Sequence, residues 1–150
     1  MTHKNKNPSI IKAEAIFDNR GSLTFSNIFN FKKIKRFYII KNHNINFIRA
    51  WHAHKHEEKF FLCIDGVFQI SCTRIKNFEE PDKKTKVYSW VLSSEKPQII
   101  YIPSGYANGS MNLSKNAKLL IYSTSTLKQS MSDDHRYSWD YWNPWKILSR

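Results

Sequence analysis

Short apolar runs separated by polar turn residues recur along the chain, and this alternation is the strongest structural signal in the sequence. Runs of five to eight residues that are apolar, or that alternate between apolar and polar, are typical of β-strands. They span residues 10–17, 22–26, 35–40, 47–54, 59–64, 67–74, 87–92, 98–102 and 118–123. Because the runs are short and are bounded by Gly, Pro, Asn and Asp, the pattern predicts an all-β sandwich or barrel.

One predicted strand carries two histidines on the same face. Side chains of an extended strand alternate, so His52 and His54 point to one side while Trp51 and Ala53 point to the other. Glu58 follows at the same parity as the histidines. We therefore expect two imidazoles and a carboxylate to share a small volume inside the sandwich.

A two-residue turn follows the next predicted strand. The apolar run ends at Ile64 and meets Asp65 and Gly66, which tolerate the positive φ angles of a hairpin turn. In such a hairpin Cys63 and Cys72 would lie far apart along the ladder, so a disulfide is not expected. Both cysteines are predicted to be buried, reduced thiols.

Length and composition predict one folded domain over residues 1–150. The 41% hydrophobic and 15% aromatic content excludes a disordered protein. No apolar run is long enough to cross a bilayer, and the polar, basic N-terminus does not resemble a secretory signal. We therefore expect a cytoplasmic protein that does not contact a membrane.

The two ends of the chain differ from the rest. Residues 1–7 are polar and are expected to be disordered. Residues 137–150 carry three tryptophans and two tyrosines, too many apolar side chains for a free tail. We expect this segment to pack on the body or on a partner subunit.

The formal net charge of +12 limits the possible partners. The basic runs at residues 32–36 and 83–86 match no nucleic-acid motif and are not interleaved with aromatic residues in a stacking pattern, so nucleic acid is not an expected partner. We expect these runs to form a solvated basic surface, whose positive field would also attract a small polyanionic substrate such as a sugar nucleotide.

Two motifs of the chain resemble those of the cupin superfamily, whose members are small double-stranded β-helix jelly rolls. They are His52-x-His54-x3-Glu58 and Pro103-x-Gly105-x2-Asn108-x3-Asn112. The resemblance implies an all-β cupin jelly roll with a single domain. In metal-binding cupins the ligands would fall on His52, His54, Glu58 and a fourth histidine, but this chain has Asn108 at the fourth position. We therefore expect no metal and no other cofactor.

Further segments resemble the sugar-nucleotide branch of the cupins, which includes dTDP-4-dehydrorhamnose 3,5-epimerases and dTDP-4-keto-6-deoxyhexose 3,4-ketoisomerases. They are Asp18-x-Arg20-Gly21, Arg49-Ala50-Trp51-His52 and the segment 102–109. The His-Ala-His-Lys sequence at 52–55 and Tyr38 resemble the ketoisomerases. Segments 102–109 and 120–124 resemble the epimerases, in which the tyrosine matching Tyr122 is the proposed general acid.

The resemblance implies an isomerase that removes a proton α to the ketone of a dTDP-linked 4-keto-6-deoxyhexose. We expect epimerisation at C3 or C5 first and 3,4-ketoisomerisation as the alternative. A hydrogen α to a ketone is acidified by the carbonyl, so a base of near-neutral pKa can remove it. His52 is expected to be this base and Tyr122 the acid, while His54 and Tyr38 support the sugar.

Four more residues are candidates for substrate binding. The guanidinium groups of Arg20 and Arg49 suit a pyrophosphate, and Asn108 and Lys55 lie within the matching motifs. A homodimer is expected, in a pathway that supplies sugars for O-antigen (lipopolysaccharide), capsule or S-layer glycan. The alternatives from other classes are a non-catalytic sugar-binding cupin and a metal-dependent cupin oxygenase.

Overall fold

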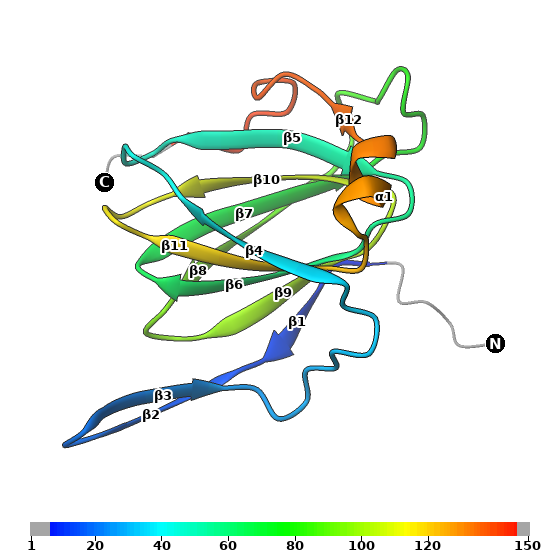
Figure 1. Ribbon diagram of the computed structural model, residues 1–150. Helices are drawn as coiled ribbons and strands as arrows, with labels where there is room; N and C mark the ends of the chain where they lie inside the picture. The colour runs from blue at the N-terminus through cyan, green and yellow to red at the C-terminus, as the bar shows by residue number, and fades with distance from the viewer. Residues whose placement is uncertain (1–6, 147–150) are drawn as a thin grey trace.

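Two antiparallel sheets of five strands face each other and form the body of the molecule (Figure 1). The structure is a computed structural model that describes residues 7–146. The first sheet has the order β1 (Ser9–Lys12), β9 (Gln98–Ile102), β6 (Lys59–Asp65), β11 (Lys118–Ser123), β4 (Arg36–Lys41). The second has the order β12 (His135–Arg136), β5 (Ile48–His54), β10 (Tyr106–Asn112), β7 (Val67–Arg74), β8 (Val87–Ser93). This architecture confirms the predicted all-β jelly roll.

Two smaller elements complete the fold. The hairpin of β2 (Glu14–Asp18) and β3 (Gly21–Phe25) projects away from both sheets (Figure 1). A short helix, α1 (Leu127–Ser132), follows β11 and begins with a capping box of Thr126 and Gln129. No helix in the described part of the chain is long and apolar enough to span a membrane.

The main hydrophobic core fills the space between the sheets. Inward side chains of both sheets, among them Phe61, Phe68, Ile70, Leu119 and Ile121, are almost fully buried. Each of these positions alternates with an outward residue, as the period of a strand requires. The core leaves one end of the sandwich free for polar side chains.

A second core covers the outer face of β5 and β10. Trp142 and Trp145 of the C-terminal segment pack on Trp51, whose indole Nε1 donates to the Trp139 and Trp142 carbonyls, each at 3.0 Å. The described part of the aromatic tail, residues 137–146, packs on the body of its own chain. The rest of the tail, residues 147–150, lies outside the described residues, and so do residues 1–6 of the N-terminal segment.

The turn at Asp65 and Gly66 does not make the predicted hairpin. β6 and β7, on its two sides, belong to different sheets, so the chain crosses from one sheet to the other here. Gly66 has a φ of 72°, and a Cβ at this position would lie 2.8 Å from the Ala117 Cβ. Glycine avoids both the backbone strain and this clash where the chain crosses between the sheets. The two cysteines are free and buried, as predicted.

The structure contains three elements that the sequence pattern did not predict, β10, α1 and β12, and it divides one predicted strand in two. The expected strand over 10–17 splits at Ala13 into β1 and β2. β10 lacks the apolar pattern of a strand because its buried side chains are mostly small or polar. α1 and β12 are each too short for a periodic signal.

Candidate active site

A cavity of about 280 Å³ opens between the two sheets beside α1. Strands of both sheets and the segment around α1 contribute to its wall. The lining residues are Arg36, Tyr38, Ile40, Arg49, His52, His54, Lys59, Phe61, Asn108, Gly109, Ser110, Ile121, Ser130 and Asp134. Five of the residues predicted from the sequence therefore meet here: Tyr38, Arg49, His52, His54 and Asn108.

His52 lies half-buried in the cavity wall on β5. Burial lowers the pKa of its imidazole, and the charge of Lys59 lowers it further, to about 4. The ring is therefore neutral at neutral pH and has a nitrogen lone pair available to accept a proton. These are the properties of a general base.

His54, two residues further along the same face, is held on both ring nitrogens. Its Nδ1 lies 2.6 Å from the Asp133 carbonyl oxygen, just after α1. Its Nε2 lies 3.0 Å from a carboxylate oxygen of Glu57 and 3.3 Å from the Lys59 ammonium. The ring is buried and oriented by the protein itself, unlike that of His52.

Glu57 is the centre of the polar cluster under the cavity. Its side chain is 0% exposed, and its oxygens accept from Arg36 Nη2 at 3.2 Å, from the Ser123 hydroxyl and from the Ser130 hydroxyl at 3.0 Å. Burial alone would raise the pKa of Glu57, but the His54 hydrogen bond, the Lys59 charge and the Ser123 hydrogen bond lower it to about 2. The carboxylate is therefore ionised.

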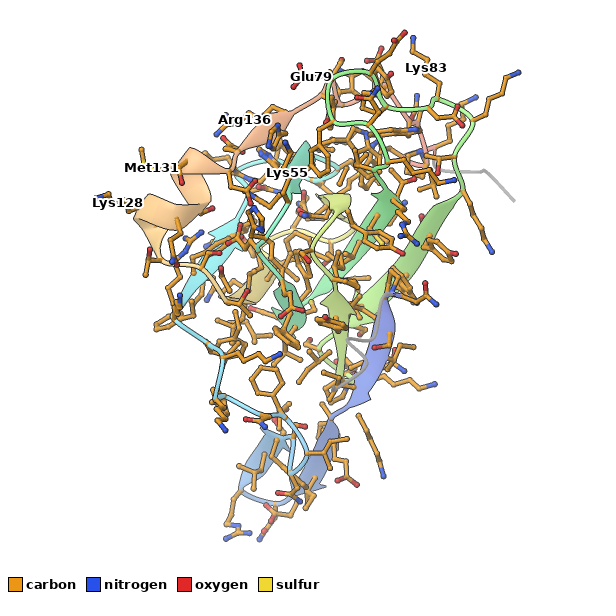
Figure 2. The ribbon with its side chains drawn as sticks, turned by 90° about the vertical axis from the view of Figure 1, so that its right-hand side faces the viewer. Lys55, Glu79, Lys83, Lys128, Met131 and Arg136 are labelled. Carbon is orange, nitrogen blue, oxygen red and sulfur yellow. The ribbon has the colours of Figure 1, made fainter. Side chains whose placement is uncertain are left out.

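Helix α1 contributes to this cluster through one side chain only. Figure 2 shows Lys128 and Met131 projecting outward from the helix. Ser130, between them in sequence, is buried and reaches Glu57. The helix thus closes the cluster from the side that the sheets leave open.

Lys59 and Tyr38 add a cation and a phenol to the cavity wall. The Lys59 side chain is only 9% exposed, and burial lowers its pKa although Glu57 opposes this effect. Burial also raises the pKa of Tyr38, so its hydroxyl stays protonated and can donate a hydrogen bond. The guanidinium of Arg36 lies 4.9 Å from the centre of the Tyr38 ring.

Arg49 and Asn108 face the cavity from two neighbouring strands. The β5–β10 register shifts between Asn108 and Ser110, which is the signature of a β-bulge. Arg49 lies at this shift, and its Nε donates to Asn42 Oδ1 at 2.7 Å, which fixes the guanidinium. Asn108 Nδ2 donates to the His52 backbone oxygen at 3.1 Å and ties β5 at His52 to β10.

Three predicted site residues, Tyr122, Arg20 and Lys55, lie away from the cavity. Tyr122 on β11 has the parity opposite to the inward Ile121 and packs against the rings of Phe29 and Phe31 on the outer face of the first sheet. This position separates Tyr122 from His52 and does not fit its expected role as general acid.

The other two are surface residues. Arg20 lies in the β2–β3 turn, where it pairs with Asp18. Lys55 follows β5, is exposed, and lies over the Phe78 ring with its Nζ 5.3 Å from the ring centre. Neither is placed to contact a ligand in the cavity of the same chain.

The four-ligand metal set of the cupin pattern is not assembled. Residues 55–58 are outside any strand, so the strand parity does not extend to Glu58. Its carboxylate accepts from the Tyr101 hydroxyl at 2.7 Å, next to the outward Phe60. Within residues 7–146 no group of three or more His, Cys, Asp or Glu side chains could hold a metal ion. The residues present therefore do not fit a cupin metal centre.

Lys59 in the cavity wall and Glu57 beneath it are two charged residues that the sequence did not single out. The inward position of Lys59 follows from the alternation along β6, in which Lys59, Phe61 and Cys63 are buried. The signal for Lys59 was therefore available in the sequence. Glu57 precedes the strand, and nothing in the sequence distinguishes it from Glu58.

An antiparallel jelly roll with a histidine-lined cavity between its sheets has the architecture of a cupin. The chain matches the model of the FdtA family (WxcM-like, C-terminal) over residues 6–142. Because this match covers most of its length, the chain belongs to that family. No curated protein sequence matches the chain.

Solved structures show the same fold. The TDP-quinovose 3,4-ketoisomerase WlaRB of Campylobacter jejuni is 28% identical with a TM-score of 0.66, over 91% of this chain and 97% of that one. A 3,4-ketoisomerase from Helicobacter canadensis is 25% identical with a TM-score of 0.67, over 91% and 96%. A dTDP-4-dehydrorhamnose 3,5-epimerase from Bacillus anthracis str. Ames is 16% identical with a TM-score of 0.77, over 99% and 90%. The predicted resemblance to this group of cupins is confirmed.

Proposed function

We propose that the protein is a 3,4-ketoisomerase that moves the ketone of a dTDP-linked 4-keto-6-deoxyhexose from C4 to C3. The observation that carries the proposal is the cavity in which His52, Tyr38 and Lys59 face a common volume. Membership of the FdtA family and the likeness to two solved 3,4-ketoisomerases support it.

His52 is the general base in this proposal. It removes the hydrogen from C3, and the electron pair of the broken C–H bond forms the C3–C4 double bond while the C4 carbonyl oxygen becomes an enolate oxygen. A base with a pKa of about 4 is weak, so the enolate must be stabilised strongly.

Lys59 and Tyr38 supply that stabilisation. A buried ammonium interacts strongly with a developing negative charge, because little water screens it. Tyr38 donates a hydrogen bond to the same region of the sugar and passes the hydroxyl proton from O3 to O4. His52 then returns its proton to C4, which yields the 3-ketone. One C–H bond breaks at C3 and one forms at C4, so the reaction needs no oxidant.

The cavity geometry favours ketoisomerisation over epimerisation, although the sequence ranked epimerisation first. An epimerase needs a base and an acid on opposite faces of the sugar ring. Tyr122, the expected acid, is directed to the outer face of the first sheet. A ketoisomerase can move its proton along one face of the sugar and has no need of an acid at that position.

The positive charge of the cavity suits a nucleotide-sugar substrate. Arg49, whose Nε is held by Asn42, keeps its terminal nitrogens for a pyrophosphate oxygen. Asn108 offers an amide to a sugar hydroxyl in the same wall. Both assignments agree with the expected binding roles, whereas Lys55 would contribute only to the field outside the cavity.

The predicted homodimer belongs to the same proposal. The β2–β3 hairpin exposes large apolar side chains on a projecting element, including Phe17 at 65% and Leu23 at 62% exposure. Burying this surface against a second copy would remove it from water. Arg20, at the tip of this hairpin, could contact a substrate only if the hairpin reaches another subunit. A cytoplasmic location stays a prediction.

The test is incubation of the protein with dTDP-4-keto-6-deoxyglucose, followed by NMR of the sugar product. The proposal predicts a 3-keto sugar. A 4-keto product inverted at C3 or C5 would establish epimerisation instead. Binding without turnover would favour the non-catalytic cupin, and turnover that requires Fe, Mn or Zn together with consumption of oxygen would favour the oxygenase.

A further inference from the structure

The hydrogen-bond partners of His54 restrict where its protons can be. Nδ1 lies 2.6 Å from the Asp133 carbonyl oxygen, and a carbonyl oxygen can only accept. Nδ1 therefore carries a proton. Nε2 lies 3.0 Å from the nearest oxygen of Glu57, and an ionised carboxylate also can only accept.

The surroundings of Glu57 keep it ionised. One oxygen accepts from Arg36 and from the Ser123 hydroxyl, and the other accepts from the Ser130 hydroxyl and faces His54. Each oxygen thus has a donor besides His54, which leaves no favourable site for a carboxyl proton. An unprotonated Nε2 would place its lone pair against a negative oxygen at hydrogen-bond distance.

Lys59 offers a competing arrangement. Its ammonium lies 3.3 Å from His54 Nε2 and could donate to an unprotonated ring. The Glu57 oxygen is nearer to Nε2 at 3.0 Å, and Lys59 Nζ lies 3.9 Å from that oxygen, an ion-pair distance that is too long for a hydrogen bond. A proton on Nε2 makes the shorter contact a charge-assisted hydrogen bond and leaves Lys59 paired electrostatically with Glu57.

We propose that Glu57 is a positioning residue that holds His54 as an imidazolium, so that the two histidines on one face of β5 are kept in opposite protonation states. His52 stays neutral and acts as the base. His54 cannot accept a proton, and its positive charge joins that of Lys59 beside the enolate oxygen. The same charge disfavours protonation of His52.

Charged and titratable groups from every element around His54 bear on this assignment. They are Arg36 and Tyr38 on β4, His52 on β5, Tyr106 on β10 directly opposite His54, Glu57 before β6, Lys59 on β6, Asp133 and Asp134 after α1, and Arg136 on β12. Glu57 is the only one of these whose carboxylate contacts the His54 ring at hydrogen-bond distance among the described residues. Its removal should therefore change the charge of the ring.

The first test is imidazole ¹⁵N NMR on the full chain at about pH 7.5, where an ordinary histidine is mostly neutral. The His54 signals are assigned by their loss in His54→Asn. In the wild type both His54 nitrogens should show the shifts of protonated nitrogens. In Glu57→Gln the amide can donate to Nε2, so this nitrogen should show the shift of an unprotonated one.

Glu58→Gln is the matched control. It makes the same substitution one residue further on, where the carboxylate contacts Tyr101 on the outer face of the sheet. His54 should stay doubly protonated in this variant. A neutral His54 in the wild type, or a doubly protonated His54 in Glu57→Gln, would overturn the proposal. If Glu57→Gln does not fold, the wild-type spectrum decides alone.

The second test is the pH dependence of kcat/KM, which rests on the proposed function, whereas the spectra do not. Without the His54 charge the pKa of His52 should rise, so the acid limb of the Glu57→Gln profile should move to higher pH, with kcat lower by about tenfold. Glu58→Gln should match the wild type. An unmoved limb in a folded Glu57→Gln variant would contradict the proposal. Absence of any turnover would reject the proposed function and leave the spectra as the test.

Discussion

The two faces of the first sheet carry similar residue types in opposite settings. On the inner face at the cavity end, Lys59 and Tyr38 surround an ionised Glu57. On the outer face Glu58 bonds to Tyr101 beside aromatic rings. A carboxylate and a tyrosine occur on both sides, so residue type does not identify the residues with a chemical role. The face of the sheet on which a side chain lies does identify them.

The inner cluster costs folding free energy that the outer face does not. Each buried charge loses hydration, and a buried ion pair is often no more stable than well-packed apolar residues of the same volume. The outer face gains ring contacts such as that of Phe60 with Tyr101, whose centres lie 5.0 Å apart. The charged cluster is therefore better explained by the chemistry of the cavity than by stability.

The largest expected effect comes from removing the base of the inner face. His52→Asn should abolish exchange of the substrate α-hydrogen, a loss on the order of 10²–10⁴-fold, because general base catalysis disappears. Nucleotide binding should persist, since the phosphates are held elsewhere. Deuterium exchange and calorimetry measure the two quantities. Exchange above a few per cent of wild type would remove His52 from this role.

A smaller loss is expected when the cation of the inner face is removed. Lys59→Met keeps most of the buried volume but leaves the enolate oxygen without the ammonium. We expect kcat to fall on the order of 10²–10³-fold, as when an oxyanion donor is lost. The measurement is steady-state conversion of the keto sugar, with circular dichroism as a check of folding. Nearly unchanged kcat would show that the ammonium does not act on the reacting oxygen.

The smallest effect concerns acid stability. The pKa of His52 is about 4 in the folded chain, below its ordinary value of 6.5. Between these two values the unfolded chain binds more protons at His52 than the folded chain does. The free energy of unfolding therefore falls as the pH falls from the ordinary pKa towards the folded one. The melting temperature of the wild type should therefore fall more steeply than that of His52→Asn between these two pH values. Parallel curves would contradict the shifted pKa.

The sequence predicted the histidine face because β5 is a regular strand with strict alternation. His52 and His54 point to the cavity, and Trp51 and Ala53 point to the second core, as expected. The same alternation fails at Glu58, because the four residues after β5 lie outside any strand. A parity argument holds only where the backbone stays extended.

Other features depend on contacts that a single sequence does not reveal. The turn at Gly66 is visible in the sequence, but whether β6 and β7 share a sheet depends on which strands pair. β10 carries Asn108, Gly109 and Ser110, whose burial comes from neighbouring strands and the C-terminal segment and not from apolar character. The choice of Tyr122 over Tyr38 as acid came from a resemblance and not from strand parity.

The most direct test of the difference between the two faces is a pair of tyrosine substitutions. Each removes one hydroxyl and keeps the ring, from the inner face in Tyr38→Phe and from the outer face in Tyr122→Phe. Conversion is followed by NMR of the product sugar. We expect Tyr38→Phe to lower kcat on the order of tenfold to a hundredfold, and Tyr122→Phe to stay within about twofold of wild type. A large loss in Tyr122→Phe with full activity in Tyr38→Phe would contradict the assignment of the chemistry to the inner face.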